Sequence, residues 1–302
     1  MTTRILLAPS ADLARKVLAE NDVQLTVEAE YGSYVAEGRL YTAAHHQPAG
    51  TKYAGTHVGG ERRSPCNDEA IPEVVDGTIL LSHVDLDTFG GCLRAAYGTW
   101  GYLFVLHQPF WDLAEYVDTR GAHKLLGSGA AEEDLRALHA FWAWSKVNVP
   151  RLGRDAVTDV TDVVRTAGEA LTSILVARSP EMLAAGAAYR AAEADLNRRT
   201  FVRRQGPVIV RRAAGRDFCN HLYSAPDGTP ALAVAAYNSE SGGVTVSLAD
   251  ATPGVSCRAI VQGLWGPEAG GHDGIAGSPR ERDVGEAGFE DAVRALSTAL
   301  GV

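Results

Sequence analysis

The stretch Thr78-Ile79-Leu80-Leu81-Ser82-His83-Val84-Asp85-Leu86-Asp87-Thr88-Phe89-Gly90-Gly91 decides the fold class. Its first five residues form an apolar run without alternation, which is typical of a strand buried on both faces of a parallel sheet. Ligand-type side chains follow the run, and a helix is expected to begin near Phe89 or Gly91. A buried strand that passes directly into a helix predicts an α/β domain.

The flanking sequence alternates between strand and helix signals. Short strands are expected at residues 4–8, 24–30 and 39–44. Ser10 can cap a helix that runs to about Glu20. Longer helices are expected at residues 131–147, 158–177 and 180–199. We therefore predict a mainly parallel sheet flanked by helices in a first domain, residues 1–200.

The last hundred residues have a different character. Turn signals such as Ala225-Pro226-Asp227-Gly228 separate short strands. The expected strands lie at residues 208–210, 231–237 and 244–248, and the expected helices at 255–264 and 287–300. This pattern predicts a smaller α+β domain with a mixed sheet, residues 201–302.

Composition narrows the function classes. The net charge of -9 argues against broad binding of long nucleic acid, which needs a basic surface. A small phosphorylated substrate fits an acidic chain if divalent metals supply local positive charge. No apolar run is long enough to span a membrane, and no signal peptide is recognisable. Four separated cysteines without a CxxC pair suggest reduced thiols in a cytoplasmic protein, and a homodimer is left open.

The strongest candidate site follows the buried strand. His83, Asp85 and Asp87 stand at alternate positions where ligands of open parallel sheets bind. Three such groups would repel one another unless a cation lies among them. Imidazole with several carboxylates suits Mn²⁺, and less specifically Mg²⁺ or Zn²⁺. The alternative is that the aspartates form a turn and a helix cap beside an ordinary histidine.

Two further segments offer ligands. His45 and His46 follow another strand, where one can bind metal while its neighbour meets substrate. Asp118 could complete a two-metal site, or it could cap a helix or form a turn. The long loop 47–76 is expected to be structural or a lid, and Asp68 is its best-placed ligand.

A glycine-rich stretch near the C-terminus is a candidate phosphate site. Glycines such as Gly270 and Gly271 let a backbone approach a ligand closely and expose amide donors. His272 and Arg280 would add charge-assisted hydrogen bonds to phosphate. Taken alone, the stretch would be read as a tight turn with an exposed histidine.

Together these motifs resemble the DHH phosphoesterases. His83-Val84-Asp85-Leu86-Asp87 is similar to the family's first metal motif, and Ala44-His45-His46 to its Asp-His-His signature. Asp118 resembles the later single aspartate that shares the metals. Residues 270–277 resemble the Gly-Gly-His-x-x-Ala-Gly stretch of the family's C-terminal substrate-binding domain. The chain departs from the family at Ala44, at Thr88 and in the order of the two motifs.

The resemblance implies a phosphoester hydrolase with two ions, for which Mn²⁺ is favoured. The ions would activate water against a nucleotide, a dinucleotide, a short oligonucleotide or polyphosphate. Asp85 is the carboxylate on which turnover should depend most, and His45 or His46 could protonate the leaving group. The departures motivate an alternative, a catalytically impaired nucleotide-binding or regulatory protein. A third class is a Zn²⁺ hydrolase of a non-phosphate bond that uses His46, His57, His83 and Asp85.

Overall fold

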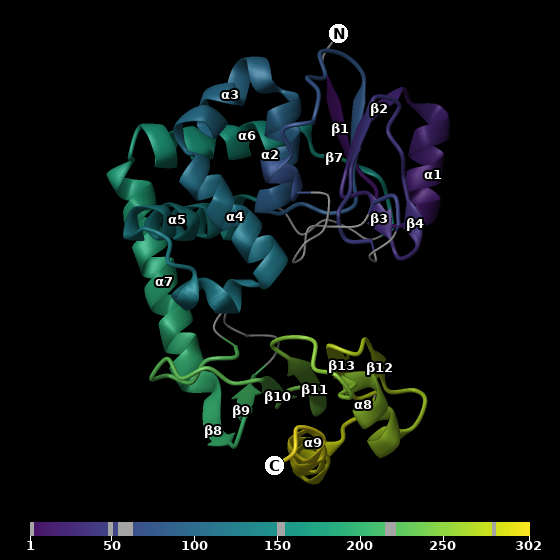
Figure 1. Cartoon of the computed structure of the whole chain (residues 1–302), viewed down its shortest axis with the longest axis vertical. Coiled ribbons are helices and arrows are strands. Elements are labelled where there is room, and N and C mark those ends of the chain that lie inside the picture. The colour runs from purple at the N-terminus through teal and green to yellow at the C-terminus, as the bar shows by residue number, and fades with distance from the viewer. Residues whose placement is uncertain (1–2, 48–50, 54–62, 150–154, 215–221, 280–281) are drawn as a thin grey trace. The chain divides into compact units, whose positions relative to one another are not determined.

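The computed structural model describes residues 3–47, 51–53, 63–149, 155–214, 222–279 and 282–302 (Figure 1). The chain forms two compact units, residues 1–189 and 190–302. The division lies inside helix α7 (Pro180–Thr200), which is earlier than the boundary expected after residue 200. Loop residue His57 and the phosphate-site candidate Arg280 lie outside the described residues.

The first unit is built on a five-stranded sheet. Its strand order is β5-β2-β6-β1-β7, and β5, β2, β6 and β1 run parallel. The strands are β1 (Arg4–Leu7), β2 (Val23–Val27), β5 (Tyr41–Ala43), β6 (Thr78–Leu81) and the antiparallel β7 (Thr158–Asp159). A separate hairpin pairs β3 (Glu30–Tyr31) with β4 (Tyr34–Val35). The predicted mainly parallel sheet is therefore confirmed.

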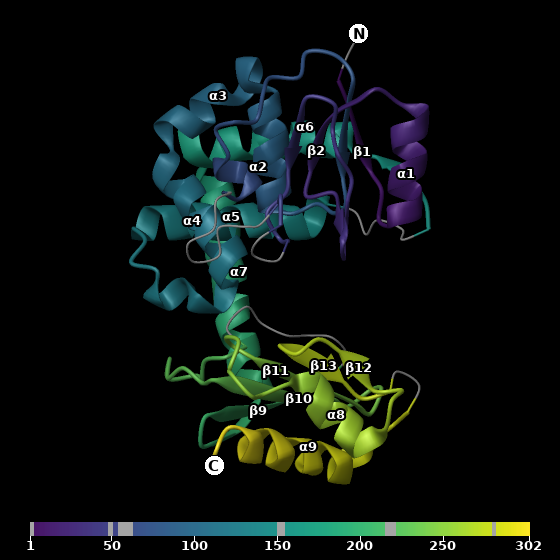
Figure 2. The ribbon, with the colours of Figure 1, turned by 45° about the vertical axis from the view of Figure 1, so that its right-hand side comes forward.

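Helices cover both faces of this sheet, as Figures 1 and 2 show. Leu6 and Leu80 point to the face of α1 (Ala11–Glu20), while Ile5, Leu7, Ile79 and Leu81 point to the opposite core. Ser10 caps α1, as predicted, because its side chain accepts a hydrogen bond from the Leu13 amide. The opposite face carries α2 (Leu86–Ala95), α4 (Gln108–Arg120), α5 (Glu132–Asn148) and α6 (Thr161–Leu171).

Several helical boundaries differ from the prediction. Helix α2 begins at Leu86 rather than near Phe89, because Asp85 caps it and forms a capping box with Thr88. Helices α3 (Tyr97–Leu106) and α4 occupy a region where no long helix was expected. Helix α6 passes into the π-helical segment η3 (Thr172–Val176), and short 3₁₀ segments form η1 (Pro65–Asn67) and η2 (Ala122–Gly127). Within the described part of the chain, no helix is long and apolar enough to cross a membrane.

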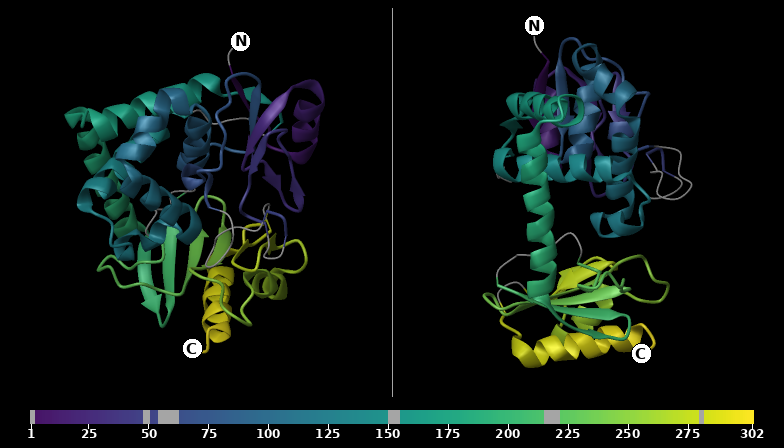
Figure 3. Two further views of the ribbon diagram at one scale, coloured as in Figure 1. Left: turned by 45° about the horizontal axis from the view of Figure 1, so that its top comes forward. Right: turned by 90° about the vertical axis from the view of Figure 1, so that its left-hand side faces the viewer.

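The second unit has the predicted mixed sheet with helices, and in its described residues the sheet has six strands, of which β8, β12 and β13 were not expected. The strand order is β12-β13-β11-β10-β9-β8, in which only β9 and β10 pair in parallel. The strands are β8 (Phe201–Gln205), β9 (Val208–Ala213), β10 (Ala233–Asn238), β11 (Gly243–Leu248), β12 (Gly270–Gly271) and β13 (Ile275–Gly277). The helices α8 (Cys257–Trp265) and α9 (Gly285–Ala299) pack on one face (Figure 3).

Candidate metal centre

The centre of the candidate site is Glu28, directly after β2. Its side chain is fully buried, and its backbone adopts a left-handed conformation with φ of 48°. This conformation costs a non-glycine residue on the order of 1–3 kcal/mol and is typical of functional positions. The Glu28 amide donates to the Ala43 carbonyl at 2.8 Å, and the Ser82 hydroxyl donates to the Glu28 carbonyl. The ends of β5 and β6 therefore hold this turn from both sides.

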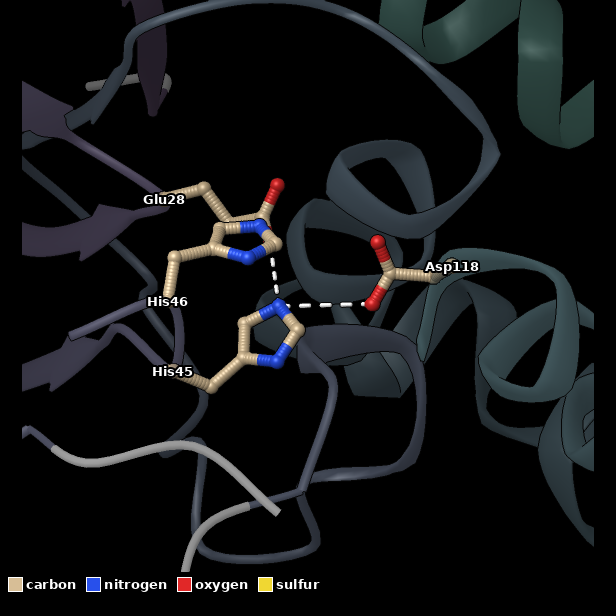
Figure 4. Close-up of side chains that lie close together, drawn as sticks. All are labelled: Glu28, His45, His46 and Asp118. Carbon is tan, nitrogen blue, oxygen red and sulfur yellow. Dashed lines mark hydrogen bonds and ion pairs between the residues drawn. The ribbon is translucent and has the colours of Figure 1, made fainter. Parts of the chain in front are cut away.

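His45 and His46 follow the neighbouring strand β5. The Nε2 atoms of both histidines face Glu28 Oε1. His46 Nε2 lies 2.9 Å from this oxygen, and His45 Nε2 lies closer still. The two rings lie 4.1 Å apart, and His45 points toward Asp118 as well as Glu28 (Figure 4). Their backbone amides donate to the Glu30 carboxylate at 3.1–3.3 Å. Adjacent histidines thus converge because Glu30 fixes the turn in which they lie.

His83 and Asp85 approach the other oxygen of Glu28. His83 Nε2 lies 3.0 Å from Glu28 Oε2 and 3.3 Å from Asp85 Oδ2. Asp85 Oδ1 accepts a hydrogen bond from the Thr88 amide at 2.9 Å, which forms the expected helix cap. Its Oδ2 takes no part in the cap and faces His83. The side chains of His83 and Asp85 are nearly half exposed. They form the open side of the site, and His45 forms the buried side.

Asp87 and Asp118 reach the buried side from helices. Asp87 lies in the first turn of α2, with Oδ2 3.9 Å from His45 Nε2. Asp118 lies in α4, with Oδ2 3.4 Å from the same nitrogen. Asp118 is therefore neither the cap nor the turn residue considered from sequence. Within the described residues, no hydrogen-bond donor reaches the buried Asp87 Oδ2.

The pKa values show how much negative charge is gathered here. Burial raises the pKa of Asp87 well above its usual range, and repulsion from Glu28, Asp118 and Asp85 adds to this effect. Burial and the nearby Glu28 also raise the pKa of Asp118. Burial would raise the pKa of Glu28 as well, but the hydrogen bonds of three histidines outweigh it and hold that pKa well below its usual range. Excess carboxylate charge of this kind calls for a proton or a cation.

His46 and His83 hold protons in the absence of such a cation. The hydrogen bond with Glu28 raises the pKa of His46 to about 9, despite partial burial. Burial lowers the pKa of His83, but the hydrogen bonds with Asp85 and Glu28 outweigh it and raise the pKa to about 11. A divalent cation would take the place of these protons, because ligation requires neutral imidazole.

The site residues form two groups with metal-ligand geometry, in each of which the ligand atoms lie within 4.8 Å of one another. One consists of Glu28, His45, His46 and Asp118, and the other of Glu28, His83 and Asp85. The donor set is imidazole with carboxylate, which suits Mn²⁺ or Zn²⁺. Asp87 Oδ2 adds an oxygen beside the first group. The buried residues can therefore hold a metal ion.

Asp68, predicted as a further ligand, belongs to neither group. Its Oδ2 accepts the Tyr41 hydroxyl at 2.8 Å, and its Oδ1 accepts the Ala70 amide at 3.1 Å. These hydrogen bonds stabilise the loop, and a ligand role for Asp68 stays a prediction. His45 is buried, whereas the His46 side chain is 40% exposed, so His46 is the more accessible of the pair.

Glu28 was not among the site residues predicted from the sequence. The strand expected there ended at Glu30, whereas β2 ends at Val27. The available signal was an acidic pair, Glu28 and Glu30, at the carboxyl end of an apolar segment. The rule that located His83 and His45 at strand ends would have selected Glu28 too.

The glycine-rich candidate lies in the second unit. Gly270 and Gly271 form β12, and a Cβ added to Gly271 would meet the Ile275 carbonyl at 2.4 Å. The His272 amide donates to that carbonyl at 2.6 Å, and the imidazole is exposed. Gly271 is therefore required by the close approach of β12 to β13. His272 remains accessible at this turn, so a phosphate role for it stays a prediction.

Comparison with known proteins adds no assignment. No protein-family model matches the chain, and no curated protein matches it either.

Proposed function

We propose that the chain is a metal-dependent phosphoester hydrolase with two divalent ions, for which Mn²⁺ is favoured. The observation that carries this proposal is the orientation of Glu28. One of its oxygens faces His45 and His46, and the other faces His83. Glu28 could therefore contribute ligand atoms to both groups of candidate metal ligands, where divalent ions would supply the Lewis acidity for hydrolysis.

Two of the three departures from the DHH pattern, those at Ala44 and Thr88, have local explanations that support the proposal. Ala44 replaces an aspartate, but Glu28 supplies a buried carboxylate from the neighbouring strand at the same sheet edge. Thr88 replaces a glycine, and its hydroxyl accepts the Asp85 amide at 2.9 Å in the capping box. The altered residues therefore leave a full set of ligand groups in place.

The accessibility of the ligands indicates where substrate would bind. His46, His83 and Asp85 have side chains 40–47% exposed, whereas His45 and Asp87 are buried. When bound, the ions would lower the pKa of water and neutralise phosphate oxygens. The residues of the open side would orient the phosphoester, and the buried residues would exclude water from the inner ligands. The proximity of His46 to Glu28 favours a ligand role for it over proton donation.

The proposed substrate is a small nucleotide, a dinucleotide, a short oligonucleotide or polyphosphate. The net charge of -9 disfavours long nucleic acid. Gly270, Gly271 and His272, with Arg280, are proposed to bind phosphate oxygens. We also propose a cytoplasmic location, and homodimer formation stays an open prediction.

The test is Mn²⁺-dependent hydrolysis across a panel of these phosphoesters. We expect activity in the unmodified chain and a loss of at least about 10³-fold in Glu28→Gln and Asp85→Ala, since each removes a ligand. Glu20→Gln changes an exposed carboxylate on α1 and is the matched control. A metal-loaded chain that binds nucleotides but hydrolyses none of the panel would instead support the impaired regulatory protein.

A further inference from the structure

The segment Ser64–Asn67 is a buried turn that contacts both carboxylates supplied by helices. It comprises Ser64 and the 3₁₀ segment η1, and all four residues are buried. The Ser64 hydroxyl donates to Asp118 Oδ2, and the Cys66 amide donates to Asp87 Oδ1 at 3.0 Å. One short segment thus holds two candidate ligands that come from different helices.

Glycines in α2 allow this turn to lie directly against the helix. A Cβ on Gly90 would meet Cys66 Cβ at 2.4 Å, and a Cβ on Gly91 would meet Pro65 Cβ at 2.8 Å. Distances below 3.0 Å force a shift of the neighbouring atoms. Helix α2 also forms a hydrogen bond with the turn, since Arg94 Nε donates to the Cys66 carbonyl at 2.7 Å. Gly90 and Gly91 therefore leave the space in which the turn packs against α2. Each glycine lowers the stability of the helix by about 1 kcal/mol relative to alanine.

Helix α4 binds the same turn from the other side. Glu115 lies one helical turn before Asp118, and its Oε1 accepts the Ser64 amide at 3.2 Å. Arg63 Nε donates to both Glu115 oxygens at 3.0 and 3.1 Å, and Asn67 Nδ2 donates to Oε2 at 3.1 Å. Ser64 is thereby fixed through its backbone, and its hydroxyl has a defined direction toward Asp118.

These hydrogen bonds leave the ligand directions of the carboxylates open. Asp87 uses Oδ1 for the turn, and its Oδ2 faces His45. Asp118 Oδ2 accepts the Ser64 hydroxyl and still lies 3.4 Å from His45 Nε2, since a carboxylate oxygen has more than one lone pair. Outer partners of this kind orient metal ligands and reduce metal affinity when they are removed.

We propose that the turn Ser64–Asn67, seated on Gly90 and Gly91, positions Asp87 and Asp118 for metal binding, and that Ser64 is the positioning residue for Asp118. The proposal deepens the proposed function and rests on its metal site. Strand ends place Glu28, the histidines and Asp85, whereas no strand places the two helical carboxylates. The turn supplies the missing constraint between α2 and α4.

The test is Mn²⁺ affinity of the full chain, measured by calorimetry or by electron paramagnetic resonance of free Mn²⁺. We expect Ser64→Ala to weaken Mn²⁺ binding about 10–100-fold. In an Asp118→Asn background, Ser64→Ala should cost no further affinity, because Ser64 acts through that carboxylate. Ser10→Ala is the matched control, since it removes a serine hydrogen bond from α1 of the same unit and should leave Mn²⁺ affinity unchanged.

The outcomes separate this proposal from the proposed function. Equal Mn²⁺ affinity in Ser64→Ala and the unmodified chain overturns the positioning role alone. Absence of Mn²⁺ binding by the unmodified chain overturns both, and binding without hydrolysis overturns only the hydrolase. If Ser64→Ala does not fold, Ser64→Cys keeps the size of the side chain with a weaker donor, and an unchanged affinity there is equally decisive against the role.

Discussion

Metal binding to this chain should release protons, and the structure sets a minimum number. The pKa of His46 is about 9 and that of His83 is about 11 in the metal-free site. At pH 7 both imidazoles are therefore at least roughly 99% protonated, and both must become neutral to bind metal. We expect about two protons to leave, with more if Asp87 and Asp118 also carry protons.

The sign of the pH dependence follows from these raised pKa values. Protons compete with metal below the pKa, so Mn²⁺ affinity should increase as the pH rises and level off in part above about pH 9, where His46 is already neutral. Each displaced proton contributes about a tenfold change per pH unit, so two protons give about a hundredfold gain from pH 6.5 to 7.5.

The assay is calorimetric titration of Mn²⁺ in buffers of different ionisation enthalpy. The slope of the observed enthalpy against the buffer enthalpy gives the proton count directly. His46→Gln should reduce the count by about one, whereas His107→Asn, which changes a histidine between α3 and α4, should leave it unchanged. A count near zero, or affinity that varies less than threefold between pH 6.5 and 7.5, would refute the assignment of His46 and His83 as ligands.

Three predictions on stability can be measured by urea denaturation. Arg211→Met should lower the free energy of unfolding of the second unit by at least about 3 kcal/mol. The buried guanidinium donates hydrogen bonds to the carbonyls of Asn197, Leu222 and Ser224, and these carbonyls would lose that donor. A loss below about 1 kcal/mol would contradict this. Gly186→Ala should lower the free energy of unfolding by about 1–3 kcal/mol, since the new Cβ would meet the backbone nitrogen of Ala140 at 2.5 Å. An unchanged urea midpoint would show that α5 and α7 separate freely. Thr88→Val should lower the free energy of unfolding by about 0.5–1 kcal/mol, because it removes the Thr88 half of the capping box of α2. Equal stability would mean that Asp85 alone caps the helix.

The fold could be predicted where the sequence pattern is local. Apolar runs such as 78–82 identify buried parallel strands, and Ser10 marks the start of α1. Knowing that parallel strands end at one sheet edge was sufficient to group His83, Asp85 and the His45-His46 pair. The strand order, with β6 between β1 and β2, was not readable, because it depends on pairing between segments far apart in the chain.

The missed parts of the site depend on tertiary contacts. Glu28 adopts a left-handed conformation because Ala43 and Ser82 hold its backbone, and nothing in a glutamate signals that conformation. Asp118 was a predicted ligand, but its place inside a helix was not predicted, and it reaches the site because α4 packs on α2 and η1. Asp68 was selected as the best-placed residue of the loop, but it lies outside both groups of candidate ligands, and its Oδ2 accepts the Tyr41 hydroxyl.

The backbone conformation and the buried charge of Glu28 lower the stability of the fold, and both bear on the proposed metal chemistry. A left-handed glutamate in a buried site is unfavourable twice, through its backbone and through its desolvated charge. Hydrogen bonds from three histidines offset the charge, and the protons of His46 and His83 must leave when a metal binds. The carboxylates Asp85, Asp87 and Asp118 make that displacement favourable, because they leave the site negative once the imidazoles are neutral. An apolar residue would avoid this cost, so the buried charge of Glu28 supports the proposed metal site.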